Sequence, residues 1–123
     1  MSFAEGFPEF EPNSLGMPFQ AIWEDESHSR TEVESLGGST LLEFGAEWCP
    51  HCQAVQPLLE ERLRDSAVRH LKVSDGKGKR LGREFQVKLW PNFVLLKDGE
   101  VVSQLARPGQ AELAQLLDSA LAG

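Results

Sequence analysis

The sequence has little of what several classes of protein require. Its 123 residues include only two cysteines, and its 12 lysines and arginines are outnumbered by 19 acidic residues. No cluster of Lys and Arg is present, which argues against a nucleic-acid partner, because phosphate binding relies on clustered cations. The first residues also contain no basic segment followed by an apolar run, so neither a secretory signal nor a membrane span is expected. We expect no membrane partner and a cytoplasmic location, or a periplasmic one if a signal peptide has been removed.

The composition is that of one globular domain. Hydrophobic residues make up 41% and charged residues 25% of the chain, and its length is sufficient for a core without disulfide or metal support. Residues 1–18 combine frequent proline and glycine and are predicted to be an irregular lead-in. Residues 19–123 are predicted to form a single domain, which we expect to be a monomer.

Hydrophobic patterning predicts alternating strands and helices followed by a hairpin and a last helix. The parallel unit and the antiparallel hairpin together imply an α/β fold with a central mixed β-sheet flanked by helices on both faces. A helix before the first of these strands is predicted to have Thr31 as its N-cap. The predicted strands are 19–23, 40–45, 68–73, 93–96 and 100–105, and the predicted helices are 29–36, 51–65, 77–85 and 110–122.

The two cysteines, Cys49 and Cys52, are only three positions apart. A bridge between them closes almost no loop, so it contributes little as a structural crosslink and points to chemistry instead. At the start of a helix, unpaired N–H groups and the helix dipole favour the thiolate of Cys49, which needs to be exposed, while Cys52 is placed to resolve a mixed disulfide. Pro50 suits the first helical turn, and His51 adds a donor or positive charge that further favours the Cys49 thiolate.

Other uses of two cysteines at this spacing are less well supported. A zinc site needs two more ligands, and the chain has only three histidines and no second cysteine pair, so no metal or cofactor is expected. A peroxide-reducing enzyme needs a separate peroxidatic motif, which is absent. Inert buried thiols are the remaining alternative. His28 and His70 are expected at the surface or half-buried.

The run from Leu42 to Cys52 closely resembles the strand, turn and active-site helix of the thioredoxin family. Pro57 resembles that family's helix-kinking proline, and Trp90-Pro91 with the hairpin beyond it resembles the family's cis-proline loop. The resemblance implies a thioredoxin-like fold and a thiol–disulfide oxidoreductase that acts on protein disulfides or small thiols. It also implies recycling by a thioredoxin reductase or a glutathione system.

The resemblance further implies roles that spacing alone does not give. Glu43 falls where the family has a buried acid that takes the proton of the resolving cysteine, and Lys72 aligns with the lysine that accompanies it. Glu43 could instead be solvated at a sheet edge, or simply be paired with Lys72.

Substrate contacts are expected next to the cysteines. Pro91 would help to dock an extended substrate backbone. Trp48, Pro50 and Trp90 are expected on the same surface, although either tryptophan could be an ordinary packing residue.

Four residues depart from the family's usual pattern. Gly45 stands where a bulky aromatic residue is common, Trp90 is larger than usual before the loop proline, and Arg107 replaces a frequent glycine. With His51, the dipeptide between the cysteines resembles that of the oxidant DsbA and favours oxidising behaviour.

The main hypothesis is a disulfide reductase, because a cytosolic location would hold the cysteine pair reduced. A DsbA-like oxidant or isomerase and a non-catalytic docking module are the alternatives.

Overall fold

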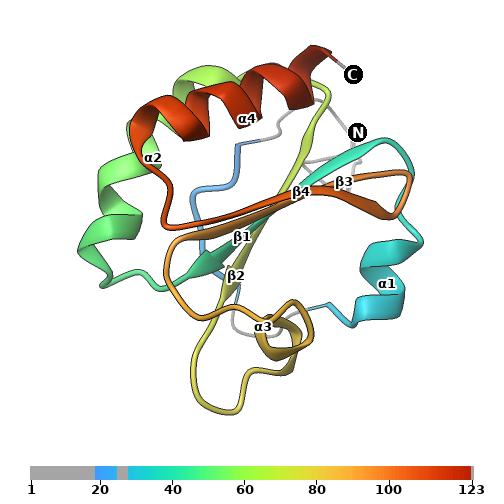
Figure 1. The fold of residues 1–123 in the computed structure, drawn as a ribbon, viewed down its shortest axis with the longest axis vertical. Coiled ribbons are helices and arrows are strands. Elements are labelled where there is room, and N and C mark those ends of the chain that lie inside the picture. The colour runs from blue at the N-terminus through green and yellow to red at the C-terminus, as the bar shows by residue number, and fades with distance from the viewer. Residues whose placement is uncertain (1–18, 25–27, 123) are drawn as a thin grey trace, which may run out of the picture.

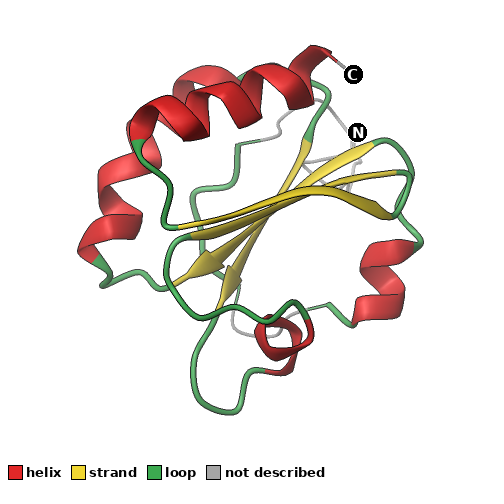
Figure 2. Ribbon diagram, viewed as in Figure 1, coloured by secondary structure: helices red, strands yellow, loops and turns green. Residues whose placement is uncertain are grey.

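A four-stranded mixed sheet lies between two pairs of helices (Figures 1 and 2). The computed structural model describes residues 19–24 and 28–122. The strand order is β2-β1-β3-β4; β1 and β2 run parallel, and the other two pairs are antiparallel. The predicted mixed sheet with helices on both faces is thus confirmed. The elements are α1 (Arg30–Glu34), β1 (Ser39–Gly45), α2 (Pro50–Leu63), β2 (Arg69–Ser74), α3 (Arg80–Glu84), β3 (Asn92–Lys97), β4 (Glu100–Ala106) and α4 (Gln110–Ala122).

The alternation of side chains along β1 divides the core between the two faces of the sheet. Leu41 packs in the cluster that contains residues of α2 and α4, whereas Leu42 and Phe44 pack in the cluster that contains residues of α1 and α3. Figure 1 shows the same division, with α2 and α4 side by side over one face. Because β1 is paired on both sides, it is buried almost throughout, and its end lies inside the molecule.

Helix α2 begins directly after the first cysteine. Cys49 is the N-cap residue, in an extended conformation, and Pro50 occupies the first helical turn, where a missing N–H costs nothing. The helix continues through Pro57 and ends at Leu63, two residues earlier than the patterning predicts. The loop between Gly45 and Cys49 therefore joins the most buried strand to the start of this helix.

Two elements at the N-terminal side differ from the sequence prediction. The predicted strand 19–23 is wrong: only Glu24 forms an isolated bridge, with Val73 of β2. Strand pairing stops there, and the backbone N–H of Gln20 donates to a side chain, His70, instead. The N-cap of α1 is Ser29 rather than Thr31, because Ser29 forms a capping box with Glu32.

Other differences come from turn chemistry. Helix α3 is shorter than the predicted 77–85, because Gly76 and Gly78 adopt positive φ and form a turn first. The hairpin is confirmed, and Asp98 and Gly99 both have positive φ, as a tight two-residue turn between antiparallel strands requires. The predicted lead-in, residues 1–18, lies outside the described residues.

Candidate active site

The two cysteines meet at the N-terminus of α2. The Sγ atom of Cys49 accepts a hydrogen bond from the backbone N–H of Cys52, with an N–S distance of 3.2 Å. Both residues are free thiols. The Cys49 sulfur thus takes the place of a capping oxygen, where a negative charge is stabilised by the unpaired N–H groups of the first turn. Cys49 therefore stays the predicted nucleophile of the pair.

The expectation of an exposed Cys49 is wrong. Its exposed fraction is 4%, because Trp23 and Trp90 pack against the small cluster that Cys49 forms with Ala46 and Cys52. Trp48 points outward, with 71% of its surface exposed, and meets Trp90 edge to face at a ring distance of 5.5 Å. Trp48 is therefore a surface residue, while Trp90 both packs on the cysteines and reaches the surface.

Trp90 is held from two sides. Its Nε1–H donates to Asp75 Oδ2 at 2.8 Å, and its carbonyl accepts from Arg107 Nε at 2.8 Å. The Trp90–Pro91 peptide bond is cis, and the carbonyl of Pro91 accepts from the backbone N–H of Arg107 at 2.7 Å. Arg107 itself has a positive φ of 46°. The loop before β3 and the end of β4 are thus tied together beside the cysteines.

Below the cysteines lies a buried polar network centred on Glu43, whose side chain has an exposed fraction of 0%. Glu43 Oε1 lies 2.8 Å from Nε2 of His70 and 3.8 Å from Nζ of Lys72. Glu43 Oε2 accepts from Gln56 Nε2 at 2.8 Å, and the same amide donates to the carbonyl of Cys52. Lys72 Nζ donates to Gln56 Oε1. Of the two open alternatives for Glu43, solvation at a sheet edge is ruled out, and a paired, buried carboxylate is observed.

Burial changes the protonation of two groups in this region. Desolvation, reinforced by the hydrogen bond with Cys49 and by the negative charge of Glu43, raises the pKa of Cys52 to about 12. Desolvation also lowers the pKa of Lys72, against the opposing effect of Glu43 and Cys52. At neutral pH, Cys52 is therefore a thiol, and it becomes a nucleophile only if a base removes its proton.

Sequence reasoning missed several residues of the site. His70 is fully buried rather than at the surface, because β2 directs it to the same side as Leu41, its neighbour in the register. Gln56 and Asp75 were not singled out, since a glutamine on a helix and an aspartate in a turn are ordinary. The spacing of Gln56, four residues after Cys52, was the one available signal, because it places the two on the same side of α2.

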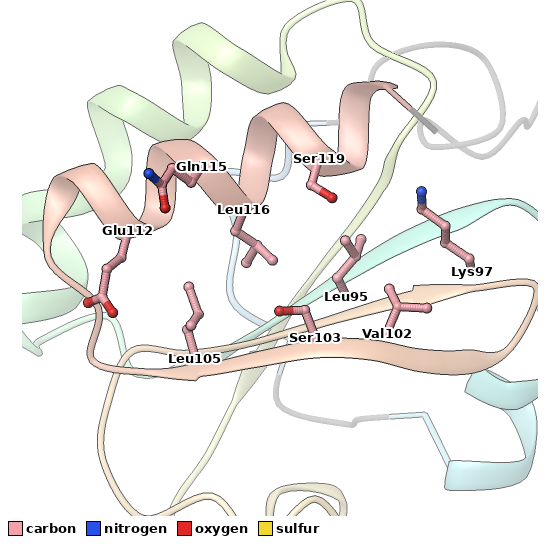
Figure 3. A pocket seen from close by; sticks show the side chains of 9 residues that line it. All are labelled: Leu95, Lys97, Val102, Ser103, Leu105, Glu112, Gln115, Leu116 and Ser119. Carbon is pink, nitrogen blue, oxygen red and sulfur yellow. The ribbon is translucent and has the colours of Figure 1, made fainter.

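The described surface includes two hollows of similar volume. One, of about 400 Å³, opens beside the network and is lined by Trp23, Gln56 and Lys72, with Glu47 and Glu60 also in its wall. The other, of about 360 Å³, lies between β4 and α4, and Leu95, Leu105 and Leu116 point into it (Figure 3). Two members of the Glu43 network, Gln56 and Lys72, line the first hollow, whereas the residues that line the second belong to β3, β4 and α4 and take no part in this network.

The remaining predicted site residues are at the surface. Pro50 and His51 are both exposed in the first turn of α2. Within the described residues, no group of three or more His, Cys, Asp or Glu side chains is placed to hold a metal ion. Nor is any helix among them long and apolar enough to cross a membrane.

Comparison with known proteins decides the family. The sequence profile of the family described as Thioredoxin matches residues 21–119. The chain belongs to the thioredoxin family. A thioredoxin from Mycobacterium tuberculosis is 36% identical over 94 residues, covering 72% of this chain and 79% of the relative. Thioredoxin H4 from Arabidopsis thaliana is 28% identical over 106 residues, covering 84% and 86%.

A solved structure supports the same assignment. Thioredoxin 2 from Pseudomonas aeruginosa PAO1, in its reduced form, superposes with a TM-score of 0.73 at 49% identity, covering 85% of this chain and 98% of that one. The resemblance of the sequence to the thioredoxin family and the thioredoxin fold are thus confirmed. Membership of this family supports a thiol–disulfide oxidoreductase.

The glycine that departs from the usual thioredoxin pattern has a structural explanation. A Cβ atom at Gly45 would lie 2.5 Å from Cys52 Sγ and 2.9 Å from the ring of Trp23. Trp23 therefore brings an aromatic ring, from the segment before α1, against the site where other thioredoxins commonly place one from β1. Sequence reasoning could not find this, because the two residues are 22 positions apart and only the fold brings them together.

Proposed function

We propose that this chain is a thioredoxin-like protein disulfide reductase in which Cys49 is the nucleophile and Cys52 the resolving thiol. The observation that carries the proposal is the position of Cys49 Sγ at the N-cap of α2, 3.2 Å from the N–H of Cys52 and above a buried carboxylate. The thiolate is the reactive form of cysteine, and a helix N-terminus stabilises it.

The first step forms a mixed disulfide. The Cys49 thiolate attacks one sulfur of the substrate disulfide, a new S–S bond forms, and the other substrate sulfur leaves as a thiolate that takes up a proton. The exposed imidazole of His51, next to Cys49 in the chain, favours the thiolate form of Cys49. Because Cys49 is buried, and Trp90 packs against it and touches Trp48, a substrate has to displace part of this aromatic cover to reach the sulfur.

The second step needs a base. Cys52 attacks Cys49 Sγ, the Cys49–Cys52 disulfide forms, and the substrate leaves reduced by two electrons. Since burial raises the pKa of Cys52 to about 12, its proton has to be taken up as it attacks. The carboxylate of Glu43 accepts that proton, and Lys72 at 3.8 Å compensates the charge of Glu43 before the transfer.

The surface around the cysteines suits a protein substrate. Trp48 supplies an exposed aromatic face, and Pro50 is exposed beside it. Trp90 and Pro91 form the loop that faces an extended substrate backbone in the proposed complex. Arg107 holds both of their carbonyls and so takes part in shaping this groove.

The wider setting follows from the same proposal. A thioredoxin reductase or a glutathione system returns the oxidised pair to the dithiol. The protein works in the cytoplasm as a monomer, and its functional domain spans residues 19–123. The dipeptide Pro50-His51 favours one second candidate, a DsbA-like oxidant, because a stabilised Cys49 thiolate makes the disulfide more oxidising. A reduction potential near about −270 mV supports the reductase, and one near about −120 mV supports the oxidant.

The test uses three forms of the full chain and a protein substrate with reducible disulfides. Cys49→Ser is expected to abolish turnover and to form no adduct. Cys52→Ser is expected to accumulate a mixed disulfide with the substrate, visible as a mass increase that a reducing agent reverses. A Cys49→Ser protein with full activity would exclude the proposed roles, and a docking module without turnover would show no activity in the wild type.

A further inference from the structure

His70 is the member of the buried network that the proposed chemistry leaves without a role. It lies on β2, beside Leu41 in the strand register, and its exposed fraction is 0%. An imidazole buried at such a place without hydrogen-bond partners is strongly unfavourable, because it loses its hydrogen bonds to water. Both ring nitrogens are, however, engaged, which makes the protonation state of the ring readable from the geometry.

The backbone of the N-terminal segment fixes the tautomer of His70. The N–H of Gln20 can only donate, and it points at Nδ1 of His70 at 2.9 Å, so Nδ1 carries a lone pair and no proton. The proton of the neutral ring is therefore on Nε2, which donates to Glu43 Oε1 at 2.8 Å. A proton added at Nδ1 would break the bond from Gln20, so the ring acts as a fixed donor and not as a proton store.

The donor orients the carboxylate. Oε1 of Glu43 is bound by His70 and paired with Lys72, which leaves Oε2 as the oxygen turned to α2, where Gln56 donates to it. Gln56 also binds the carbonyl of Cys52. Anchoring Oε1 from β2 thus presents Oε2 to the helix that carries the thiol.

We propose that His70 is a positioning residue that holds the Glu43 carboxylate in the orientation in which it accepts the proton of Cys52. The proton moves from Cys52 Sγ to Glu43, and the sulfur attacks Cys49 Sγ of the mixed disulfide with release of the substrate thiol. His70 exchanges no proton in this step and touches neither sulfur. The proposal rests on the proposed function, since it concerns the resolving step of that reaction.

The groups near the His70 imidazole come from β1, from β2 and from the N-terminal segment. Glu43 of β1 bonds to the ring and pairs with Lys72 of β2, whereas the N-terminal segment contributes the uncharged Gln20 and the ring of Phe19, 5.7 Å from the imidazole. With Glu43 and Lys72 of opposite charge, a neutral His70 leaves the pair balanced.

The experiment separates the two chemical steps. The reduced full-length chain is mixed with an aromatic disulfide whose released thiolate is coloured: attack by Cys49 releases a first equivalent, and resolution by Cys52 releases a second. His70→Leu is expected to slow the second phase about 10-fold, because a hydrogen bond to a charged group is lost, and to leave the first within about twofold. His70→Gln, whose amide can donate to Glu43, is expected to restore most of the second phase.

Two controls distinguish positioning from a loss of stability. Val33→Ala weakens the core on the opposite face of the sheet and is expected to lower stability without slowing the second phase. In a Glu43→Gln background, His70→Leu is expected to have no further effect on the second phase. If His70→Leu does not fold, His70→Asn replaces it, since the shorter amide does not reach Glu43.

The proposal is overturned by an unchanged second phase in His70→Leu, by an equal slowing of both phases, or by the same slowing in Val33→Ala. It is also overturned if the ring nitrogen signals of His70 in NMR spectra at neutral pH show the Nδ1–H tautomer or an imidazolium. Release of a single equivalent by the wild type means that the proposed function itself has failed. Two equivalents with an unchanged His70→Leu mean that only the role of His70 has.

Discussion

The two faces of the sheet are built from the same strands but contain different chemistry. Towards α1 and α3, the strands present mainly apolar side chains, with Thr40 and Asn92 as uncharged polar exceptions, whereas towards α2 and α4 an apolar cluster is continued by a carboxylate, an imidazole and an ammonium group. Buried polar groups are costly and need full pairing. One face of the sheet therefore contributes mainly to the stability of the fold, whereas the other also contains the groups of the proposed reaction. On β1 and β2 the apolar set is Leu42, Phe44, Leu71 and Val73, and the polar set is Glu43, His70 and Lys72.

The largest expected effect is on stability and comes from the apolar face. Leu42→Ala removes a fully buried side chain and is expected to lower the free energy of unfolding by about 2–5 kcal/mol. The rate of disulfide exchange per folded molecule should not change. Denaturant unfolding and the two-phase thiol release measure the two quantities, and a slowed exchange at full folding would contradict the division between the faces.

On the polar face, the change with the largest expected effect on rate is Glu43→Gln. Removing the proton acceptor should slow the release of the second thiol equivalent about 100-fold and leave the first release unchanged. Stopped-flow measurement of both phases checks this, with Glu61→Gln, an exposed site on α2, as the matched control. Equal rates in Glu43→Gln and the wild type would remove Glu43 from the mechanism.

A smaller effect is expected beyond the ends of the strands, where Asp75, just after β2, accepts a hydrogen bond from the indole of Trp90, just before β3. Asp75→Ala removes one half-buried acceptor, worth about 1 kcal/mol, and should raise KM for a protein disulfide about fivefold with kcat nearly unchanged. Steady-state kinetics with Glu61→Ala as a charge control measure this change. A fall in kcat alone would show that the indole acts on the chemistry rather than on docking.

The smallest expected effect concerns Cys52, which should contribute almost no thiolate absorbance below about pH 10. Because burial raises the pKa of Cys52 to about 12, only about 1% of this thiol is ionised at pH 10, and the fraction rises as the pH increases further. The difference in thiolate absorbance between the wild type and Cys52→Ala should therefore stay near zero up to about pH 10. A full thiolate from Cys52 near its ordinary pKa of 9.0 would show that the thiol is not desolvated.

Much of the fold follows from local sequence. The apolar run of β1, the amphipathic α4 and the turn at Asp98 and Gly99 each depend on residues that are neighbours in the chain, and all three elements lie where the patterning places them. Two errors, the N-cap of α1 and the start of α3, come from local capping and turn chemistry, and a third occurs where a distant contact decides. The N-terminal segment is no strand because the N–H of Gln20 binds His70, fifty positions away.

The candidate site divides in the same way. Cys49, Cys52 and Pro50 are found from their spacing, and Glu43 and Lys72 come from the resemblance to the thioredoxin family. His70 escapes because it is one of several polar residues in this strand, with Arg69 and Lys72, and the sequence does not show which of them has a buried partner. The burial of Cys49 also escapes, since the ring that covers it belongs to Trp90, which is 41 positions later in the chain.

The short segment before α1 has a practical consequence for anyone who trims this protein. Within residues 19–24, Gln20 fixes a ring in the polar network, Trp23 occupies the space beside Cys52 that Gly45 leaves open, and Glu24 is bonded to both sides of Val73. A shortened version that starts at the first regular helix looks conservative on a secondary-structure diagram. It would nevertheless remove residues that contact Cys52, His70 and β2, so residues 19–24 have to be kept.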